Sequence, residues 1–135
     1  MKKIIIVLLL LTSMIQAKEY KVVFNLTSGS EEKIAKSLIK NVEVLRANYK
    51  KQGDTLKVAV VISGHSYKFF LKESSYPDLD LKKFSKNVNF EVCSVGMKKR
   101  NIKKTSLLPF VVPAFNRTEA LIRYQNNGYA YVPIN

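Results

Sequence analysis

The sequence has few of the residues that build disulfide or metal frameworks. It contains one cysteine and one histidine among 135 residues. A framework of several disulfide bonds is therefore excluded, and so is a zinc site made of several Cys and His ligands. A GKT/S phosphate loop and a G-x-G-x-x-G turn are both missing, so no nucleotide site is indicated. We predict no cofactor.

Long hydrophobic runs are also missing. The longest apolar run, Ile4 to Leu11, is shorter than the roughly 20 residues needed to cross a bilayer. It follows two lysines, and the small residue Ala17 closes the segment, which is the layout of a secretory signal peptide. We therefore predict that residues 1–17 are a cleaved signal peptide and that no stable membrane span remains. Residues 18–135 then form one exported domain, in the bacterial periplasm.

Acidic residues are scarce, with 10 Asp and Glu against 23 Lys and Arg, and the formal net charge is +13. Charge of this sign can indicate a nucleic-acid partner. Export argues against that class, and the lysines are scattered as on a solvated surface. We predict no nucleic-acid partner, whereas a weak attraction to anionic lipids or envelope polymers stays open.

The chain does contain a regular alternation of short apolar runs and amphipathic segments. Crossovers of this length join parallel strands by right-handed connections. The pattern therefore predicts an α/β domain, with one largely parallel sheet of about five strands and helices on both faces. The predicted strands are 21–26, 56–62, 88–93, 110–113 and 129–133. The predicted helices are 30–51 with its cap, 67–71, 79–85, 95–100 and 117–125, with one further turn at 105–108.

Ligands of such sheets bind beyond the carboxyl ends of the strands. Segments 25–30, 63–66 and 93–97 lie there. The first two are rich in Gly and Ser, which let backbone amides approach an anion, although the same residues also form plain turns. The candidate ligand-binding residues are Thr27, Ser28, Gly29, Ser63, Gly64, His65, Ser94 and Gly96.

Cys93 has the most informative position, because it ends a predicted strand and begins a helix. The helix dipole and free backbone amides favour a thiolate there. Lys98, Lys99 and Arg100 would act in the same direction. A single cysteine in an exported protein has no internal disulfide partner, so it is either buried in the core or retained as a reactive residue. A reactive thiol and a buried, inert thiol are therefore both open.

His65 follows the neighbouring strand and could lie near Cys93. A Cys–His nucleophilic pair and a soft-metal site of Cys93, His65 and Met97, suited to copper, stay open. The simpler interpretation places His65 in a solvated turn and Met97 in the core, with no metal bound. Glu91 is interpreted as solvated, and no pair of carboxylates stands out for acid–base chemistry.

From Val88 onward the chain combines a strand ending in cysteine, a leucine-rich turn, a short strand ending in proline and a helix leading to Gly-Tyr-Ala-Tyr. These elements read NFEVC (89–93), MKKRNI (97–102), SLLP (106–109), VVP (111–113), EALIRYQ (119–125) and NGYAYV (127–132). The earlier segment VAVVISGHSYKFFL (58–71) adds a second strand and a Gly-containing turn. Together they resemble the DsrE/DsrF-like family of sulfur-relay proteins over essentially the whole of residues 18–135.

The resemblance implies a three-layer α/β/α sandwich on a parallel five-stranded sheet and assembly into homotrimers or hexamers. It also implies that Cys93 accepts sulfur as a persulfide and passes it to a partner thiol. The family often has Gly-Asn-Ser or Gly-Asn-Thr after the cysteine, where this chain has Ser94-Val95-Gly96. It often has His-Gly after the second strand, where this chain has Ser63-Gly64.

We therefore predict an exported sulfur carrier or sulfurtransferase. Its partners would be a sulfur donor and a sulfur acceptor, each a small molecule or a protein thiol. The alternative is a non-catalytic module that binds a small anion or a protein on the basic carboxyl edge of the sheet.

Overall fold

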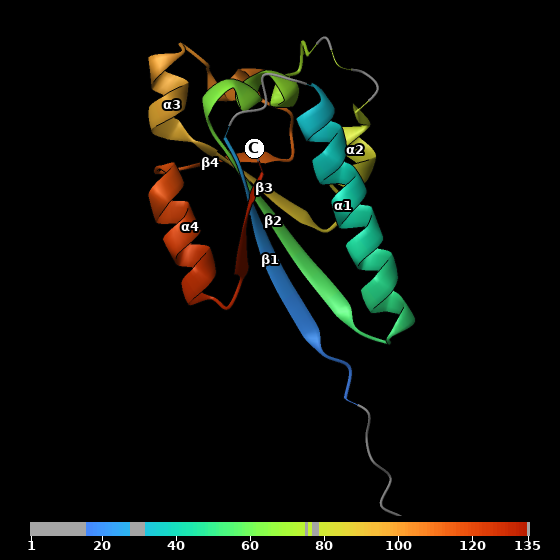
Figure 1. Ribbon diagram of the computed structural model, residues 1–135. Coiled ribbons are helices and arrows are strands. Elements are labelled where there is room, and N and C mark those ends of the chain that lie inside the picture. The colour runs from blue at the N-terminus through green and yellow to red at the C-terminus, as the bar shows by residue number, and fades with distance from the viewer. Residues whose placement is uncertain (1–15, 28–31, 75, 77–78, 135) are drawn as a thin grey trace, which may run out of the picture.

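The computed structural model describes residues 16–27, 32–74, 76 and 79–134. Within these residues, five strands form one sheet in the order β4-β3-β2-β1-β5 (Figure 1). All neighbouring strands are parallel. The strands are β1 (Glu19–Leu26), β2 (Thr55–Ile62), β3 (Val88–Cys93), β4 (Val111–Ala114) and β5 (Ala130–Ile134).

Helices cover both faces of the sheet. The helices are α1 (Glu32–Lys51), α2 (Leu81–Phe84), α3 (Ser94–Lys99) and α4 (Arg117–Asn126), with 3₁₀ helices η1 (Gly64–Phe70) and η3 (Lys104–Ser106). Figure 1 shows α1 and α2 on one face and α4 on the other. Met97 of α3 packs in the same cluster as α1. The three-layer α/β/α arrangement is therefore confirmed, and every strand ends at the same edge.

The sheet divides the core into two unequal clusters. Phe24, Val60 and Phe90 share the larger cluster with Leu38 and Val42, which recur at helical spacing on α1. The central strands are buried on both faces, which explains their nearly continuous apolar sequences. The smaller cluster, on the α4 side, consists of Val23, Ala59, Val61, Ala114, Ala120 and Tyr124.

The predicted strands are confirmed to within two residues at each end. Two predictions at the carboxyl edge were wrong in detail. The helix predicted at 67–71 is the 3₁₀ helix η1, which begins at Gly64. The helix predicted at 95–100 is α3, which begins one residue earlier, at Ser94. The predicted N-cap Ser30 lies outside the described residues.

The described chain becomes anchored at Lys18. Its backbone N–H donates to Asp54 Oδ1 at 2.8 Å, and its carbonyl oxygen accepts from the Thr55 N–H at 2.9 Å. The first residue of the predicted mature chain is thus tied to the start of β2. Most of the predicted signal peptide, residues 1–15, lies outside the described residues. In the part of the chain that is described, no helix has the length and apolar character needed to cross a bilayer.

Candidate functional site

Three of the candidate residues form one row at the carboxyl edge of the sheet. β2 and β3 pair in register up to Ile62. The Ser63 N–H then donates to the Leu26 carbonyl at 3.0 Å, which continues the parallel ladder with β1 by one residue. Thr27, Ser63 and Cys93 therefore lie side by side on three adjacent strands, as expected for residues beyond the carboxyl ends.

The Cys93 thiol faces backbone N–H groups from two helices. Burial leaves Cys93 9% exposed and by itself raises the pKa of the thiol. The Gly96, Arg117 and Val95 backbone N–H groups, together with the nearby Tyr67 hydroxyl, outweigh burial, so the Cys93 pKa lies below its ordinary value. Gly96 and Val95 belong to the first turn of α3, and Arg117 is the first residue of α4. The site therefore favours a thiolate.

Tyr67 fixes the cysteine backbone. Its hydroxyl, on η1, donates to the Cys93 carbonyl oxygen at 2.7 Å. Burial raises the pKa of Tyr67, and so does the neighbouring Cys93, which keeps the hydroxyl protonated as a donor. A Cβ on Gly96 would overlap this hydroxyl. Gly96, predicted as a ligand-binding residue, thus makes room for Tyr67.

The sequence did not single out Tyr67. It belongs to the apolar segment after β2, and its ring is buried with 2% exposure, as a purely structural residue would be. The Arg100 guanidinium also lies over this ring, 5.3 Å from its centroid. Only the tertiary contact of the hydroxyl with Cys93 distinguishes Tyr67 from its aromatic neighbours.

Gly64 brings the loop after β2 against the end of β1. Its φ of +64° lies in the left-handed region, and a Cβ there would overlap the Thr27 carbonyl. A side chain at this position would therefore push the two loops apart. The predicted association of Thr27 with Ser63 and Gly64 is thus present in the structure, as a backbone contact.

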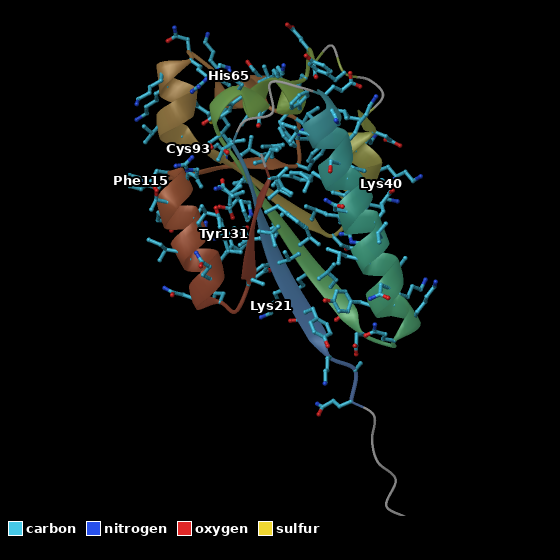
Figure 2. The ribbon with its side chains drawn as sticks, viewed as in Figure 1. Lys21, Lys40, His65, Cys93, Phe115 and Tyr131 are labelled. Atoms are coloured by element: carbon cyan, nitrogen blue, oxygen red, sulfur yellow. The ribbon has the colours of Figure 1, made fainter. Side chains whose placement is uncertain are left out.

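The remaining candidates gain no ligand role from the structure, and two of them lie outside the described residues. His65 is exposed on η1, whereas Cys93 is buried at the end of β3 (Figure 2), so a Cys–His pair gains no support. Met97 is packed in the core. Among the described residues, no group of three or more His, Cys, Asp and Glu side chains is placed to hold a metal ion. Ser94 is half-buried at the start of α3. Ser28 and Gly29 lie outside the described residues.

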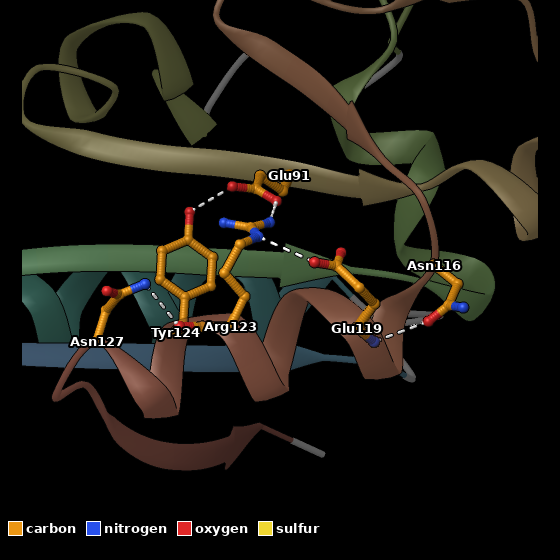
Figure 3. A network of polar contacts seen from close by, with 6 residues as sticks. All are labelled: Glu91, Asn116, Glu119, Arg123, Tyr124 and Asn127. Carbon is orange, nitrogen blue, oxygen red and sulfur yellow. Dashed lines mark hydrogen bonds and ion pairs between the residues drawn. The ribbon is translucent and has the colours of Figure 1, made fainter.

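The interpretation of Glu91 as a solvated side chain was wrong. Its carboxylate accepts hydrogen bonds from the Tyr124 hydroxyl and from Arg123 Nη2, both at 2.6 Å (Figure 3). Burial, followed by the bond to Glu91, raises the pKa of Tyr124. The hydrogen bond to Glu91 is also the main cause of the raised pKa of Arg123. These contacts join α4 to β3.

The same network continues to the start of α4. Arg123 Nε donates to Glu119 at 3.1 Å, and the Glu119 N–H donates to Asn116 Oδ1 at 2.8 Å as the N-cap bond of the helix (Figure 3). The capped end of α4 carries the Arg117 N–H that faces Cys93. These bonds fix the first turn of α4 and join the helix to β3. The amino end of α4 is thereby held next to the Cys93 thiol.

Two broad grooves lie elsewhere. One of about 610 Å³ is lined by residues at the amino ends of the strands, among them Arg46, Lys57 and Asn89. Another of similar volume lies beside α1 and α2, and its lining includes Lys40 and Lys83. Neither includes Cys93, so these grooves do not place a small molecule at the thiol.

Comparisons with known proteins agree with this fold. Residues 20–134 match the DsrE/DsrF-like family. The solved structure of the protein of unknown function MTH1491 from Methanobacterium thermoautotrophicum is similar with a TM-score of 0.74 and 24% sequence identity. The match covers 84% of this chain and 98% of that chain, and it shows a shared fold. No protein with a curated description matches this chain.

Proposed function

The chain belongs to the DsrE/DsrF-like family, which relates it to sulfur relay, and on that premise we propose a specific role for Cys93. In this proposal the protein is an exported sulfur carrier, and Cys93 accepts a sulfur atom as a persulfide and passes it to a partner thiol. The observation that carries the proposal is the thiol itself, which faces backbone N–H groups of α3 and α4 and has a lowered pKa.

The chemistry needs two exchanges. In the first, the Cys93 thiolate attacks the terminal sulfur of a persulfide or polysulfide; a new S–S bond forms, the donor S–S bond breaks, and the donor leaves as a thiolate. In the second, an acceptor thiolate attacks the terminal sulfur held on Cys93, and Cys93 leaves as a thiolate. Both steps exchange one sulfur atom without a further oxidant or reductant.

The hydrogen bonds at Cys93 serve both exchanges. A lowered pKa raises the fraction of attacking thiolate in the first exchange and makes Cys93 a better leaving group in the second. Cys93 is 9% exposed, which favours donors and acceptors whose reacting sulfur ends a thin chain. A polysulfide or a cysteine side chain on an extended segment has this shape.

A mass measurement tests the proposal. Residues 18–135 are incubated with polysulfide or thiosulfate, beside Cys93→Ser, and the intact masses are recorded. We expect a gain of one sulfur mass that dithiothreitol removes and that the variant does not show. No adduct on the folded protein, with normal thiol labelling after unfolding, would mean that Cys93 is a buried core residue and would refute the proposal.

Export and assembly belong to the same proposal. We propose cleavage after Ala17, a periplasmic location and a homotrimer or hexamer. N-terminal sequencing of the protein from a periplasmic extract should begin at Lys18. Light scattering during size-exclusion chromatography should give three or six times the chain mass, and a monomer at micromolar concentration would contradict the assembly.

A binding module is the second candidate. Lys98, Lys99 and Arg100 are exposed at the end of α3, next to the carboxyl edge. They favour an anion or an acidic protein surface without any covalent step. Calorimetric binding of thiosulfate that survives Cys93→Ser, with no mass adduct on the wild type, would favour this candidate.

A further inference from the structure

We propose that the Ser63 hydroxyl binds the terminal sulfur of a persulfide on Cys93 and positions that sulfur for transfer. The inference rests on the proposed function, because it gives Ser63 a role in binding the sulfur atom that Cys93 would carry as a persulfide. Ser63 would not touch the reduced thiol, so its role begins only when the second sulfur is present.

The first observation is an unpartnered hydroxyl. Ser63 is 7% exposed, and its Oγ is buried without a hydrogen-bond partner. A buried hydroxyl in this state loses its bonds to water and gains none in return, which destabilises the folded protein. Such a group calls for a physical explanation, and a ligand that arrives during function supplies one.

The second observation is the direction of the side chain. Ala59 and Val61 pack in the cluster on the α4 side of the sheet. Ser63 continues the extended backbone with φ −154° and ψ −178°. Because side chains alternate along a strand, the Ser63 hydroxyl lies on the same side as Ala59 and Val61.

Cys93 packs in the larger cluster with Met97, and its sulfur also reaches the α4 side. Two residues earlier on β3, the Glu91 carboxylate reaches Arg123 and Tyr124 of α4. The Cys93 sulfur in turn faces the Arg117 N–H at the amino end of α4. Ser63 and Cys93 are therefore neighbours in one row, on adjacent strands about 4.8 Å apart.

A persulfide on Cys93 would offer the Ser63 hydroxyl an acceptor that the reduced thiol does not provide. In the reduced protein the Ser63 Oγ has no partner, so it does not bond the Cys93 sulfur. A persulfide places a second sulfur about 2.05 Å beyond the first. That extension carries the terminal sulfur toward the neighbouring strand. When ionised, it is an anionic acceptor, to which a hydroxyl donates a stronger bond than to a neutral one.

The test measures sulfur exchange at equilibrium. Residues 18–135 are mixed with glutathione persulfide and glutathione, and the persulfidated fraction is read from intact mass for the wild type and Ser63→Ala. The matched control is Ser74→Ala, since the Ser74 Oγ is also buried without a partner but lies outside the Cys93 row. The iodoacetamide rate of the reduced thiol and the Tm are recorded for each protein.

We expect Ser63→Ala to lower the equilibrium constant for persulfide formation about tenfold or more, in line with loss of one hydrogen bond to a charged acceptor. Ser74→Ala should stay within about twofold of the wild type. The alkylation rate of the reduced thiol should change by less than about twofold, and the Tm of Ser63→Ala should not fall, because an unsatisfied group has been removed.

The outcomes distinguish the role of Ser63 from the proposed function of Cys93. If the wild type forms a persulfide and Ser63→Ala forms it equally well, the role of Ser63 is refuted while the proposed function stands. If the wild type forms none, both are refuted. An equal loss in Ser63→Ala and Ser74→Ala, a lower Tm, or an equal loss of thiol alkylation would show a structural effect and would also overturn the inference.

Discussion

At the scale of single residues, the environment of Cys93 depends on a residue without a side chain. Gly96 leaves the space that the Tyr67 hydroxyl fills, and that hydroxyl holds the Cys93 carbonyl. The Cys93 backbone is thus positioned by a glycine and a buried tyrosine.

We predict that Gly96→Ala disturbs both the fold and the thiol. The added Cβ must displace the Tyr67 hydroxyl, which should lower the free energy of unfolding by about 1–3 kcal/mol. The Cys93 pKa should rise as the hydrogen bonds around it lengthen. Urea unfolding and the pH dependence of alkylation measure the two effects.

Tyr67→Phe provides the control for this substitution. It removes the atom nearest to the new methyl group, so Gly96→Ala should be less destabilising when it is combined with Tyr67→Phe than when it is made alone. Equal losses in both backgrounds would show that the clash with the hydroxyl is not the cause.

The lowered pKa of Cys93 also predicts a dependence of stability on pH. A group whose pKa is lower in the folded chain stabilises the fold fully above its unfolded pKa and loses that contribution as pH falls through the folded pKa. The stability of the wild type relative to Cys93→Ser should therefore increase as pH rises between these two values. Iodoacetamide rates should have a lower midpoint pH in the folded than in the urea-unfolded protein, and coincident midpoints would contradict the prediction.

At the scale of elements, one half-buried carboxylate adds polar contacts between α4 and the sheet. The Glu91 side chain is 16% exposed and accepts two bonds from α4, whereas the Glu119 pair with Arg123 is exposed on the helix surface. The two glutamates share Arg123 but differ in burial.

We predict that Glu91→Ala lowers the free energy of unfolding by about 1–3 kcal/mol, because it leaves the buried Tyr124 hydroxyl without its acceptor. Glu119→Ala should lower it by at most about 0.5 kcal/mol, as expected for an exposed i,i+4 pair. Denaturant unfolding of both variants measures the difference, and similar losses would mean that the Glu91 contacts add little to stability.

These contacts show where sequence-based prediction reached its limit. The strands could be predicted because buried parallel strands leave continuous apolar runs, and the row of Thr27, Ser63 and Cys93 follows from where those runs end. Glu91 could not be placed, because its partners lie 32 and 33 residues away on α4. Neither could η1, whose course depends on the left-handed conformation of Gly64.

At the scale of the whole molecule, the two faces of the sheet differ. Among the described residues, the large apolar side chains that remain exposed lie mainly on elements of the α4 side. They are Val112, Phe115, Ile122 and Tyr131, whereas Val44 lies on α1 and Val95 on α3. Phe115 directly follows Ala114, which pairs with Cys93 across β3 and β4. This asymmetry supports contact through the α4 side in the proposed homo-oligomer.

We expect Phe115→Ser to lower the mass measured by light scattering, because Phe115 is 74% exposed and contributes little to the core of one chain. Val44→Ser, at 59% exposed on α1, is the matched control and should leave the mass unchanged. Equal masses for the wild type and Phe115→Ser would exclude this side of the molecule as the contact.

The contact of Lys18 with Asp54 would give the proposed removal of residues 1–17 a thermodynamic effect. In the precursor the donor is an uncharged amide, at 2.8 Å from the carboxylate. Cleavage after Ala17 would turn the same nitrogen into an α-ammonium group, and a charge-assisted bond is stronger than a neutral one. The processed chain should therefore have a higher Tm than the precursor, and Asp54→Asn should reduce that difference. Proteolytic processing would then stabilise the fold only once the chain has left the compartment in which it must stay unfolded for export.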